Sequence, residues 1–189
     1  RLLRSSINLK YNLKDVIPRN LSIRNQKSTN SCWAFSAISS LETNLALSNY
    51  KRGVNLSKIY DFSERHVEYA TSNVFFNNGI NEKGYNRKVG SGGNYPYAAS
   101  YLTNGSGAIL EKNMPFEDNE DIIDVSKIKN KTVASQVYDT VEFPDYNKQT
   151  SENRTAIMNQ LKQHIQVYGS IYACIHGADA NSLNYSCYN

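Results

Sequence analysis

The sequence predicts an α+β protein in which helical segments come first along the chain and strand segments come later. Apolar residues recur at helical spacing through much of 32–102. By contrast, residues 131–143 are rich in Val, Thr and Tyr, and every second residue of 171–175 is aliphatic, as in strands. The 189 residues, 40% of them hydrophobic, fit one domain or two small lobes that share an interface.

The first predicted helix runs from Cys32 to about Leu47, after the turn-rich loop 25–31. Its apolar residues recur at i, i+4, i+7 and i+11, and further apolar positions widen this stripe. We therefore expect the helix to be buried on most sides. Ser31 stands where a helix N-cap is expected, because Ser is a preferred residue at that position.

Three more helices are predicted downstream. One starts at Ser63, one covers 95–102, and one opens at Ser151 and stops at Gly169, since Ser and Gly mark helix starts and ends. The last of them is expected to turn four apolar residues inward: Ile157, Leu161, Ile165 and Tyr168. Strands are expected within 131–143 and 171–175, and a surface loop at 117–124.

Composition argues against several functional classes. The 21 basic and 17 acidic residues give a net charge of +4 and are scattered, so no nucleic-acid surface is indicated. Three cysteines without CxxC spacing and three histidines give no metal site, and we expect no cofactor. No apolar run approaches the roughly 18 residues of a membrane span. Because the chain starts at Arg1, we expect a processed product, an excised domain or a fragment.

The feature that points to chemistry is Cys32 at the start of a buried helix. Unpaired N–H groups and the helix dipole favour a thiolate at this position, and the thiolate is the nucleophilic form of cysteine. The same N–H groups can hold a developing oxyanion. Gln26, six residues upstream, adds an amide donor. The alternative is that Cys32 is simply a small buried residue of the helix.

The local sequence favours the first interpretation. Gln26, five residues, then Cys-Trp-Ala-Phe-Ser over 32–36 resembles the active-site segment of papain-family cysteine proteases. Weaker similarities follow in the family's order along nearly the whole chain, at 11–15, 62–64, 92–93, 114–116 and 169–173. Residues 92–94, 98–102 and 107–111 look closest to bacterial members, including clostridial cell-wall-associated proteases.

The resemblance implies the papain-like two-lobe fold. Residues 1–189 would form a single catalytic domain that stops before its His/Asn segment. Residues of about 25–125 would make a mainly helical lobe, and about 126–189 would begin a β-rich lobe. Many family members join the loop before the cysteine to the segment before the Gly-Gly pair by a disulfide. Thr29 and Gly90 stand at these positions, which implies a disulfide-free branch.

The resemblance also implies roles for single residues. Cys32 would attack the peptide bond, and its own N–H and the Gln26 amide would hold the oxyanion. A wall of the substrate cleft would comprise Gly92, Gly93, Asn94 and Tyr95. Cys174 would line the specificity pocket, unless it is a buried strand residue. Cys187, in a polar tail, is expected to be an exposed thiol or a disulfide partner.

The catalytic His and Asn of the family are expected beyond residue 189. His66, His164 and His176 lack the family's His-Ala context, and we expect surface or loop-end positions for all three. His176, directly after the last predicted strand, is the alternative general base, because a thiol nucleophile requires a partner that takes its proton.

The sequence therefore predicts a cysteine endopeptidase that works through an acyl-enzyme. Two alternatives remain open: a catalytically inactive papain-like module for binding or adhesion, and a papain-fold acyltransferase. The expected partners are a protein or peptide substrate, an inhibitory propeptide, and a C-terminal remainder of the same domain. The resemblance implies a secreted or cell-surface zymogen.

Overall fold

The computed structural model describes residues 10–17, 23–54, 60–76, 84–118 and 131–174. Its helices are α1 (Leu13–Val16), α2 (Cys32–Lys51), α3 (Glu64–Ala70), α4 (Asn73–Phe76), α5 (Tyr95–Thr103) and α7 (Ser151–Tyr168), with short 3-10 helices η1 (Glu111–Asn113) and η2 (Tyr146–Lys148). All four helices expected from the sequence are confirmed. The short elements α1, α4, η1 and η2 were not predicted.

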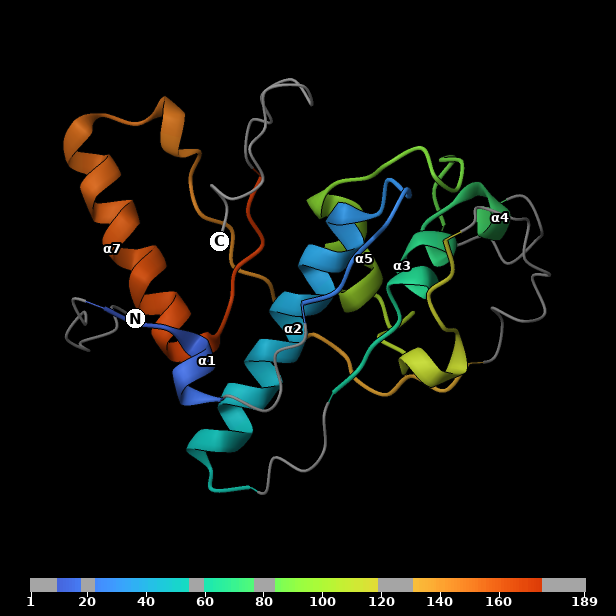
Figure 1. Cartoon of the computed structure of the whole chain (residues 1–189). Coiled ribbons are helices and arrows are strands. Elements are labelled where there is room, and N and C mark those ends of the chain that lie inside the picture. The colour runs from blue at the N-terminus through green and yellow to red at the C-terminus, as the bar shows by residue number, and fades with distance from the viewer. Residues whose placement is uncertain (1–9, 18–22, 55–59, 77–83, 119–130, 175–189) are drawn as a thin grey trace.

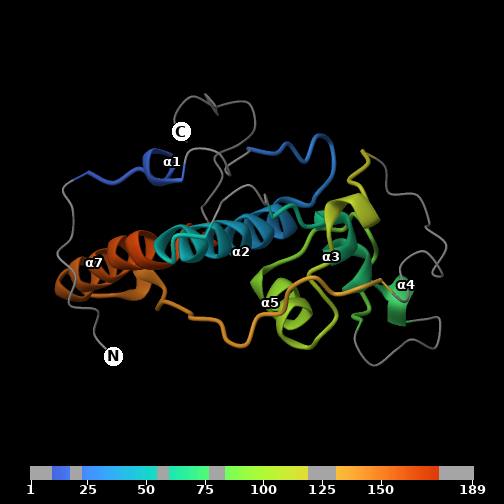
Figure 2. The same ribbon diagram turned by 90° about the horizontal axis from the view of Figure 1, so that it is seen from below.

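Helix α2 is the element around which the others are arranged (Figure 1). Helices α3 and α5 pack beside it on one side and α7 packs on the other. Figure 2 shows α2 and α7 running side by side away from the group formed by α3 and α5. The buried side chains of α2 include Trp33, Ala34, Ile38 and Leu47. The predicted burial of this helix on most sides is thus confirmed, and the helix runs one turn beyond the expected end.

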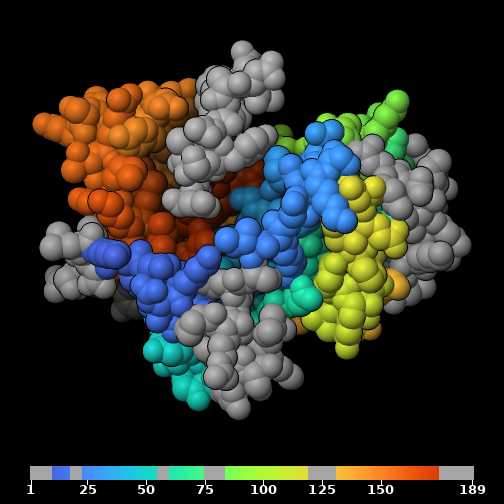
Figure 3. Space-filling view, in the orientation of Figure 1, coloured from blue at the N-terminus to red at the C-terminus, as the bar shows by residue number. Residues whose placement is uncertain are grey.

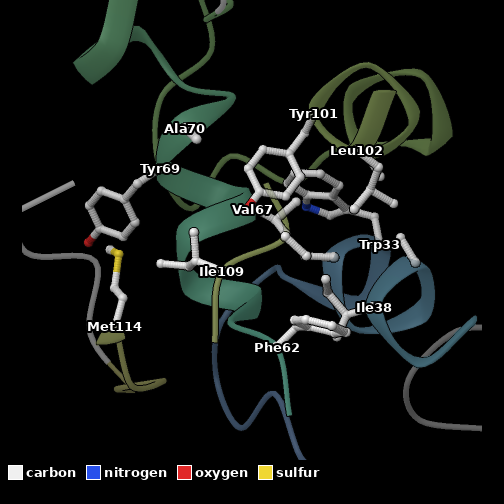
Figure 4. Close-up of a cluster of buried hydrophobic side chains, with 14 residues drawn as sticks. Trp33, Ile38, Phe62, Val67, Tyr69, Ala70, Tyr101, Leu102, Ile109 and Met114 are labelled. Carbon is white, nitrogen blue, oxygen red and sulfur yellow. The ribbon is translucent and has the colours of Figure 1, made fainter. Parts of the chain in front are cut away.

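The main core lies where α2, α3 and α5 meet (Figure 4). Trp33 and Ile38 of α2 face Val67 of α3, while Tyr101 of α5 and Phe62 pack against the same cluster. Each large apolar side chain buried to this extent contributes about 1.5–3 kcal/mol to stability. A single antiparallel bridge between Phe62 and Leu110 holds the chain before α3 against the chain after α5.

Helix α3 is buried over its whole length, including its charged and polar residues. His66 is 3% exposed, and its Nδ1 is hydrogen-bonded to the Tyr101 hydroxyl at 2.7 Å. Burial raises the pKa of Tyr101. The expectation of a surface His66 is wrong, because the tyrosine of α5 supplies the partner that a buried imidazole requires.

An ionic cluster around Arg24 joins the loop before α2 to α2 and α3. The guanidinium contacts the carboxylates of Glu42 at 2.6 Å, Asp61 at 2.5 Å and Glu64. It also donates to the Phe62 carbonyl at 3.0 Å. Burial raises the pKa of Glu64 to about 7, although Arg24 acts to lower it. One Arg side chain thus fixes three chain segments that are distant in sequence.

Helix α7 ends at Gly169, whose φ of 105° suits glycine. Its last turn is tied to α2: Asn44 donates to the Tyr168 carbonyl at 2.8 Å, and Lys51 donates to the Val167 carbonyl at 2.7 Å. Ile157 is buried, as expected. The expectation for Tyr168 is wrong, because its side chain is 46% exposed.

The described residues form no β-strand ladder, so a β-rich lobe is not confirmed. Residues 131–143 are extended and bond to the chain around α5, with Ala108 donating to the Ser135 carbonyl at 2.6 Å and Val137 donating to Leu102 at 3.1 Å. Residues 171–174 are also extended. An extended segment becomes a strand only when a neighbouring strand pairs with it, and the described ranges offer none.

Among the described residues, no helix combines the length and the apolar character that a bilayer-crossing segment requires.

The raised pKa of Glu64 predicts how stability depends on pH. The folded protein keeps this proton up to about pH 7, whereas the ordinary glutamate value is 4.5. The folded state therefore binds more protons between these values, and stability falls as the pH rises through this window. Glu64→Gln is expected to show a flatter dependence, measured as melting temperature from about pH 4.5 to about pH 8. Identical slopes for the two proteins would contradict the assignment.

Candidate active site

Cys32 is the first residue of α2 and its side chain is an exposed free thiol. The preceding loop turns at Lys27, whose φ is 52°, and is closed by a bond from the Thr29 N–H to the Gln26 carbonyl at 3.2 Å. The Thr29 hydroxyl donates to the same carbonyl at 2.7 Å. The loop thereby delivers the chain from Gln26 to the amino end of a buried helix.

Gln26 is half-buried, and its Oε1 is buried without a hydrogen-bond partner in the described part of the chain. The backbone of Gln26 is held by Thr29, whereas no hydrogen bond in this region uses its buried amide oxygen. A buried polar atom without a partner is uncommon in folded proteins. The side chain is therefore not needed to close the loop.

Ser31 is the N-cap residue of α2, as expected, but its side chain makes no capping bond. Its hydroxyl donates instead to Oε2 of Glu68 at 2.8 Å. Glu68 lies 37 positions later in the sequence, on α3, and is buried. A tertiary contact has thus replaced the local bond that a helix-initiating serine usually makes.

The glycine segment expected to wall the cleft lies against α2. A Cβ at Gly93 would lie 2.7 Å from Nε1 of the buried Trp33, so only glycine fits there without displacing the indole. Arg87 lies over the same ring, 5.0 Å from its centroid, and donates to the Gly92 carbonyl at 2.8 Å. Burial lowers the pKa of Arg87. The side chain of Asn30, two residues before the cysteine, donates to the Gly90 carbonyl at 2.9 Å.

Tyr95 and Asn94 differ in their surroundings. Asn94 is exposed and forms no capping bond at the start of α5. The Tyr95 ring lies 6.0 Å from the Tyr172 ring, and the Tyr95 hydroxyl is bonded to the Thr140 hydroxyl at 2.9 Å. The Tyr97 ring lies 6.2 Å from the Trp33 ring, between centroids, and packs against the main core, which Tyr95 does not.

The segment after α7 contains Tyr172, which is influenced by both described thiols. The pKa of Tyr172 is raised to about 12, first by burial and then by the neighbouring thiols Cys174 and Cys32. Cys174 is an exposed free thiol, so the alternative of a buried strand residue is wrong. Sequence reasoning missed Tyr172. The signal that could have identified it is a bulky Tyr at a position where the family motif that 169–173 resembles has Ser.

No described histidine takes the place of the catalytic base. His66 lies in the core beside Tyr101, and His164 lies on α7 between the rings of Phe143 and Tyr168. His176 and Cys187 lie outside the described residues, so their expected roles stay predictions. Within the described ranges, no three His, Cys, Asp or Glu side chains gather as metal ligands.

A cavity of about 410 Å³ lies between α1 and α2 and is lined in part by Leu13, Arg24, Phe35 and Ser170. Cys32 is not among its lining residues. Figure 3 shows the hollow between the α7 side of the molecule and the segment that leads into α2. The Cys32 thiol thus lies at the surface and outside this cavity.

The close contact at Gly93 gives a testable consequence. Gly93→Ala is expected to destabilise the protein by about 1–3 kcal/mol, because the added methyl group overpacks a buried indole. Asn94→Ala, at an exposed neighbouring position without a capping bond, is the control and should change stability by less than about 0.5 kcal/mol. Thermal and denaturant unfolding measure both. Equal effects of the two substitutions would contradict the contact.

Comparisons with known proteins agree with this geometry. The sequence profile described as papain family cysteine protease matches residues 14–187. No curated protein sequence matches the chain significantly. Among solved structures, the clostridial cysteine protease Cwp84 after propeptide cleavage is 28% identical with a TM-score of 0.52, covering 65% of this chain and 27% of that one.

A second Cwp84 structure, of the cysteine protease and lectin-like domains of this surface layer associated protein of Clostridium difficile, is 29% identical with a TM-score of 0.53. It covers 69% of this chain, and the chain spans 26% of its length. Both likenesses are thus to about a quarter of a longer protein. The profile match covers most of the sequence, and the chain belongs to the papain family of cysteine proteases with a papain-like fold.

Proposed function

We propose that this protein is a cysteine endopeptidase that hydrolyses peptide bonds through the thiolate of Cys32. The observation that carries the proposal is the position of Cys32, an exposed thiol at the first residue of a long helix that is otherwise largely buried. The first N–H groups of a helix have no partner within it and carry positive partial charge. The site therefore offers a nucleophile and a place for negative charge at the same point.

In the first step the Cys32 sulfur attacks the substrate carbonyl carbon, and the carbonyl oxygen becomes an oxyanion. The Cys32 N–H and the Gln26 side-chain amide hold this oxygen. Collapse of the intermediate breaks the C–N bond, releases the amine and leaves an acyl-enzyme, which water then hydrolyses. The His that carries the protons and the Asn that orients it come from sequence outside the described residues, as the family resemblance implies.

The substrate binds as an extended peptide along the segments on either side of Cys32. Gly92 and Gly93 form one wall. A Cβ at Gly92 would point into open space, so its absence lets a substrate backbone approach closely, whereas the missing Cβ of Gly93 makes room for Trp33. Asn94 and Tyr95 continue this wall, with Tyr95 facing Tyr172 at 6.0 Å between ring centroids. Cys174, an exposed thiol close to Tyr172, lines the opposite side, as the family resemblance implies.

The wider setting of the domain follows the same resemblance. Residues 1–189 belong to one catalytic domain, with about 25–125 in the helical lobe and about 126–189 beginning the second lobe. The chain is made as a secreted or cell-surface zymogen with an inhibitory propeptide. This is supported by the Cwp84 structures, one of which is described after propeptide cleavage and the other as surface layer associated.

Product analysis on peptide substrates tests the function. A peptidase yields two fragments with a free carboxylate and a free amine. An acyltransferase yields ligated products when an acceptor amine is added, and an inactive binding module yields neither. We expect hydrolysis that is lost in Cys32→Ser and kept in Cys174→Thr. Ligation as the main reaction, or binding of peptide without turnover, would overturn the proposal.

Gln26 gives a sharper test of the mechanism. Gln26→Ala should lower kcat by about 10²–10³, as the loss of one oxyanion donor does. Its melting temperature should stay nearly unchanged, because the buried Oε1 of Gln26 makes no hydrogen bond among the described residues. Thr29→Val, which removes the hydroxyl bonded to the Gln26 carbonyl, is the loop control and should act mainly on stability. A shift in melting temperature without a fall in kcat would mean that Gln26 is structural.

A further inference from the structure

Glu68 is a buried carboxylate with a partner on each oxygen. It is 3% exposed. Its Oε2 accepts from the Ser31 hydroxyl at 2.8 Å, and its Oε1 accepts from the Gly90 N–H at 3.0 Å. Burying a carboxylate is costly unless hydrogen bonds compensate it. This side chain therefore spans from the residue before the nucleophile to the start of the glycine wall.

The bond to Ser31 determines what the helix end presents. A serine before a helix usually turns its hydroxyl inward and accepts from the second or third N–H of the helix. Here the hydroxyl is a donor to Glu68, and Ser31 makes no side-chain capping bond. The carbonyl of Ser31 already accepts from Ala34 at 2.8 Å. The N–H groups of Cys32 and Trp33 are consequently not covered by a serine oxygen, whereas those of Ala34 and Phe35 already donate to the Ser31 carbonyl.

The bond to Gly90 acts on the other side of the site. Gly90 is also held by Asn30, whose amide donates to its carbonyl at 2.9 Å. Arg87 donates to the Glu68 backbone carbonyl at 2.6 Å and to the Gly92 carbonyl at 2.8 Å. Both ends of the Gly90–Gly92 turn are therefore attached to α3 at Glu68.

From this geometry we propose that Glu68 is a positioning residue for the Cys32 site. Its carboxylate holds the Ser31 hydroxyl away from the first turn of α2, which leaves the helix donors available to negative charge on Cys32 or on substrate. It also anchors the glycine wall through Gly90. Glu68 touches neither substrate nor sulfur, so it acts through Ser31 and Gly90.

This inference rests on the proposed function, so its main readout does not require turnover. The readout is the rate at which iodoacetamide alkylates Cys32 in the full chain at neutral pH, followed by peptide mapping. Cys174, an exposed free thiol, is the internal control in every sample. If the unmodified protein fails to cleave peptides, the proposed function fails, and the alkylation rates still decide the role of Glu68.

Two neutral substitutions separate orientation from charge. In Glu68→Gln the amide oxygen can accept from Gly90, and the NH₂ group can donate to Ser31, so the hydroxyl stays turned away. In Glu68→Leu neither bond is possible and the serine is free to cap α2. We expect Cys32 in Glu68→Leu to react at least about fivefold more slowly than in Glu68→Gln, the scale of a helix cap. Iodoacetamide should alkylate Cys174 at the same rate in Glu68→Leu and in Glu68→Gln.

Adding Ser31→Ala to Glu68→Leu removes the oxygen that would cap the helix. The double variant should regain the Cys32 rate of Glu68→Gln. In peptide hydrolysis Glu68→Leu should lower kcat, because the serine caps α2, and raise KM, because Gly90 loses its bond to Glu68. The double variant should regain kcat but keep the raised KM, because Gly90 stays unanchored. If Glu68→Leu acted only through lost packing, neither the Cys32 alkylation rate nor kcat would recover in the double variant.

Equal Cys32 rates in Glu68→Gln and Glu68→Leu would overturn the proposal, as would a double variant that stays slow. If Glu68→Leu melts below the assay temperature, Glu68→Asp replaces it, because the shorter side chain keeps the charge but cannot reach both partners. Cys32 should be alkylated more slowly in Glu68→Asp than in the protein without substitutions, and adding Ser31→Ala should restore the rate. If Cys32 were alkylated in Glu68→Asp as fast as in the protein without substitutions, the proposal would also be overturned.

Discussion

The constraint on which the structure depends is that α2 is buried along most of its length and open at its first residue. Its side chains pack against α3 and α5 on one side and α7 on the other. A buried helix must still satisfy the polar groups at its end. The Ser31 carbonyl meets part of this requirement by accepting from Ala34 and Phe35, while contacts with α3 and with the glycine segment fix the residues just before the helix. The thiol of Cys32 is thereby left exposed on a rigid support.

Several polar contacts among the described residues involve buried or partly buried charges. Arg24 meets three carboxylates beneath the loop, and Arg87 lies over the Trp33 indole while it holds Gly92. Such groups are stable in a core only when their partners are in place. Thr29 and Gly90 stand where the resemblance puts a disulfide in many family members. Here Asn30 and Glu68 connect the same two segments by hydrogen bonds.

Features that depend on neighbours in sequence were predictable. Periodicity gave α2 and α7, and the residues Ser63 and Gly169 marked helix boundaries. Features that depend on distant partners were not. Ser31 is a typical cap in sequence, but its partner Glu68 lies on another helix. His66 is buried because Tyr101 is opposite it, and the strand patterns had no neighbouring strand with which to pair among the described residues. The family motif is local, so the sequence alone could nominate Cys32 and Gln26 as candidate site residues.

The central claim is that position makes Cys32 the nucleophile, although Cys174 is equally a free, exposed thiol. Reaction of the full chain with a peptidyl epoxide, followed by peptide mapping, tests this claim directly. The epoxide requires an activated thiolate bound in a peptide cleft, so exposure alone should not suffice for reaction. The account predicts stoichiometric modification of Cys32, with Cys174 and Cys187 unmodified over the same time. Preferential modification of Cys174 or Cys187, or equal modification of all three thiols, would contradict it.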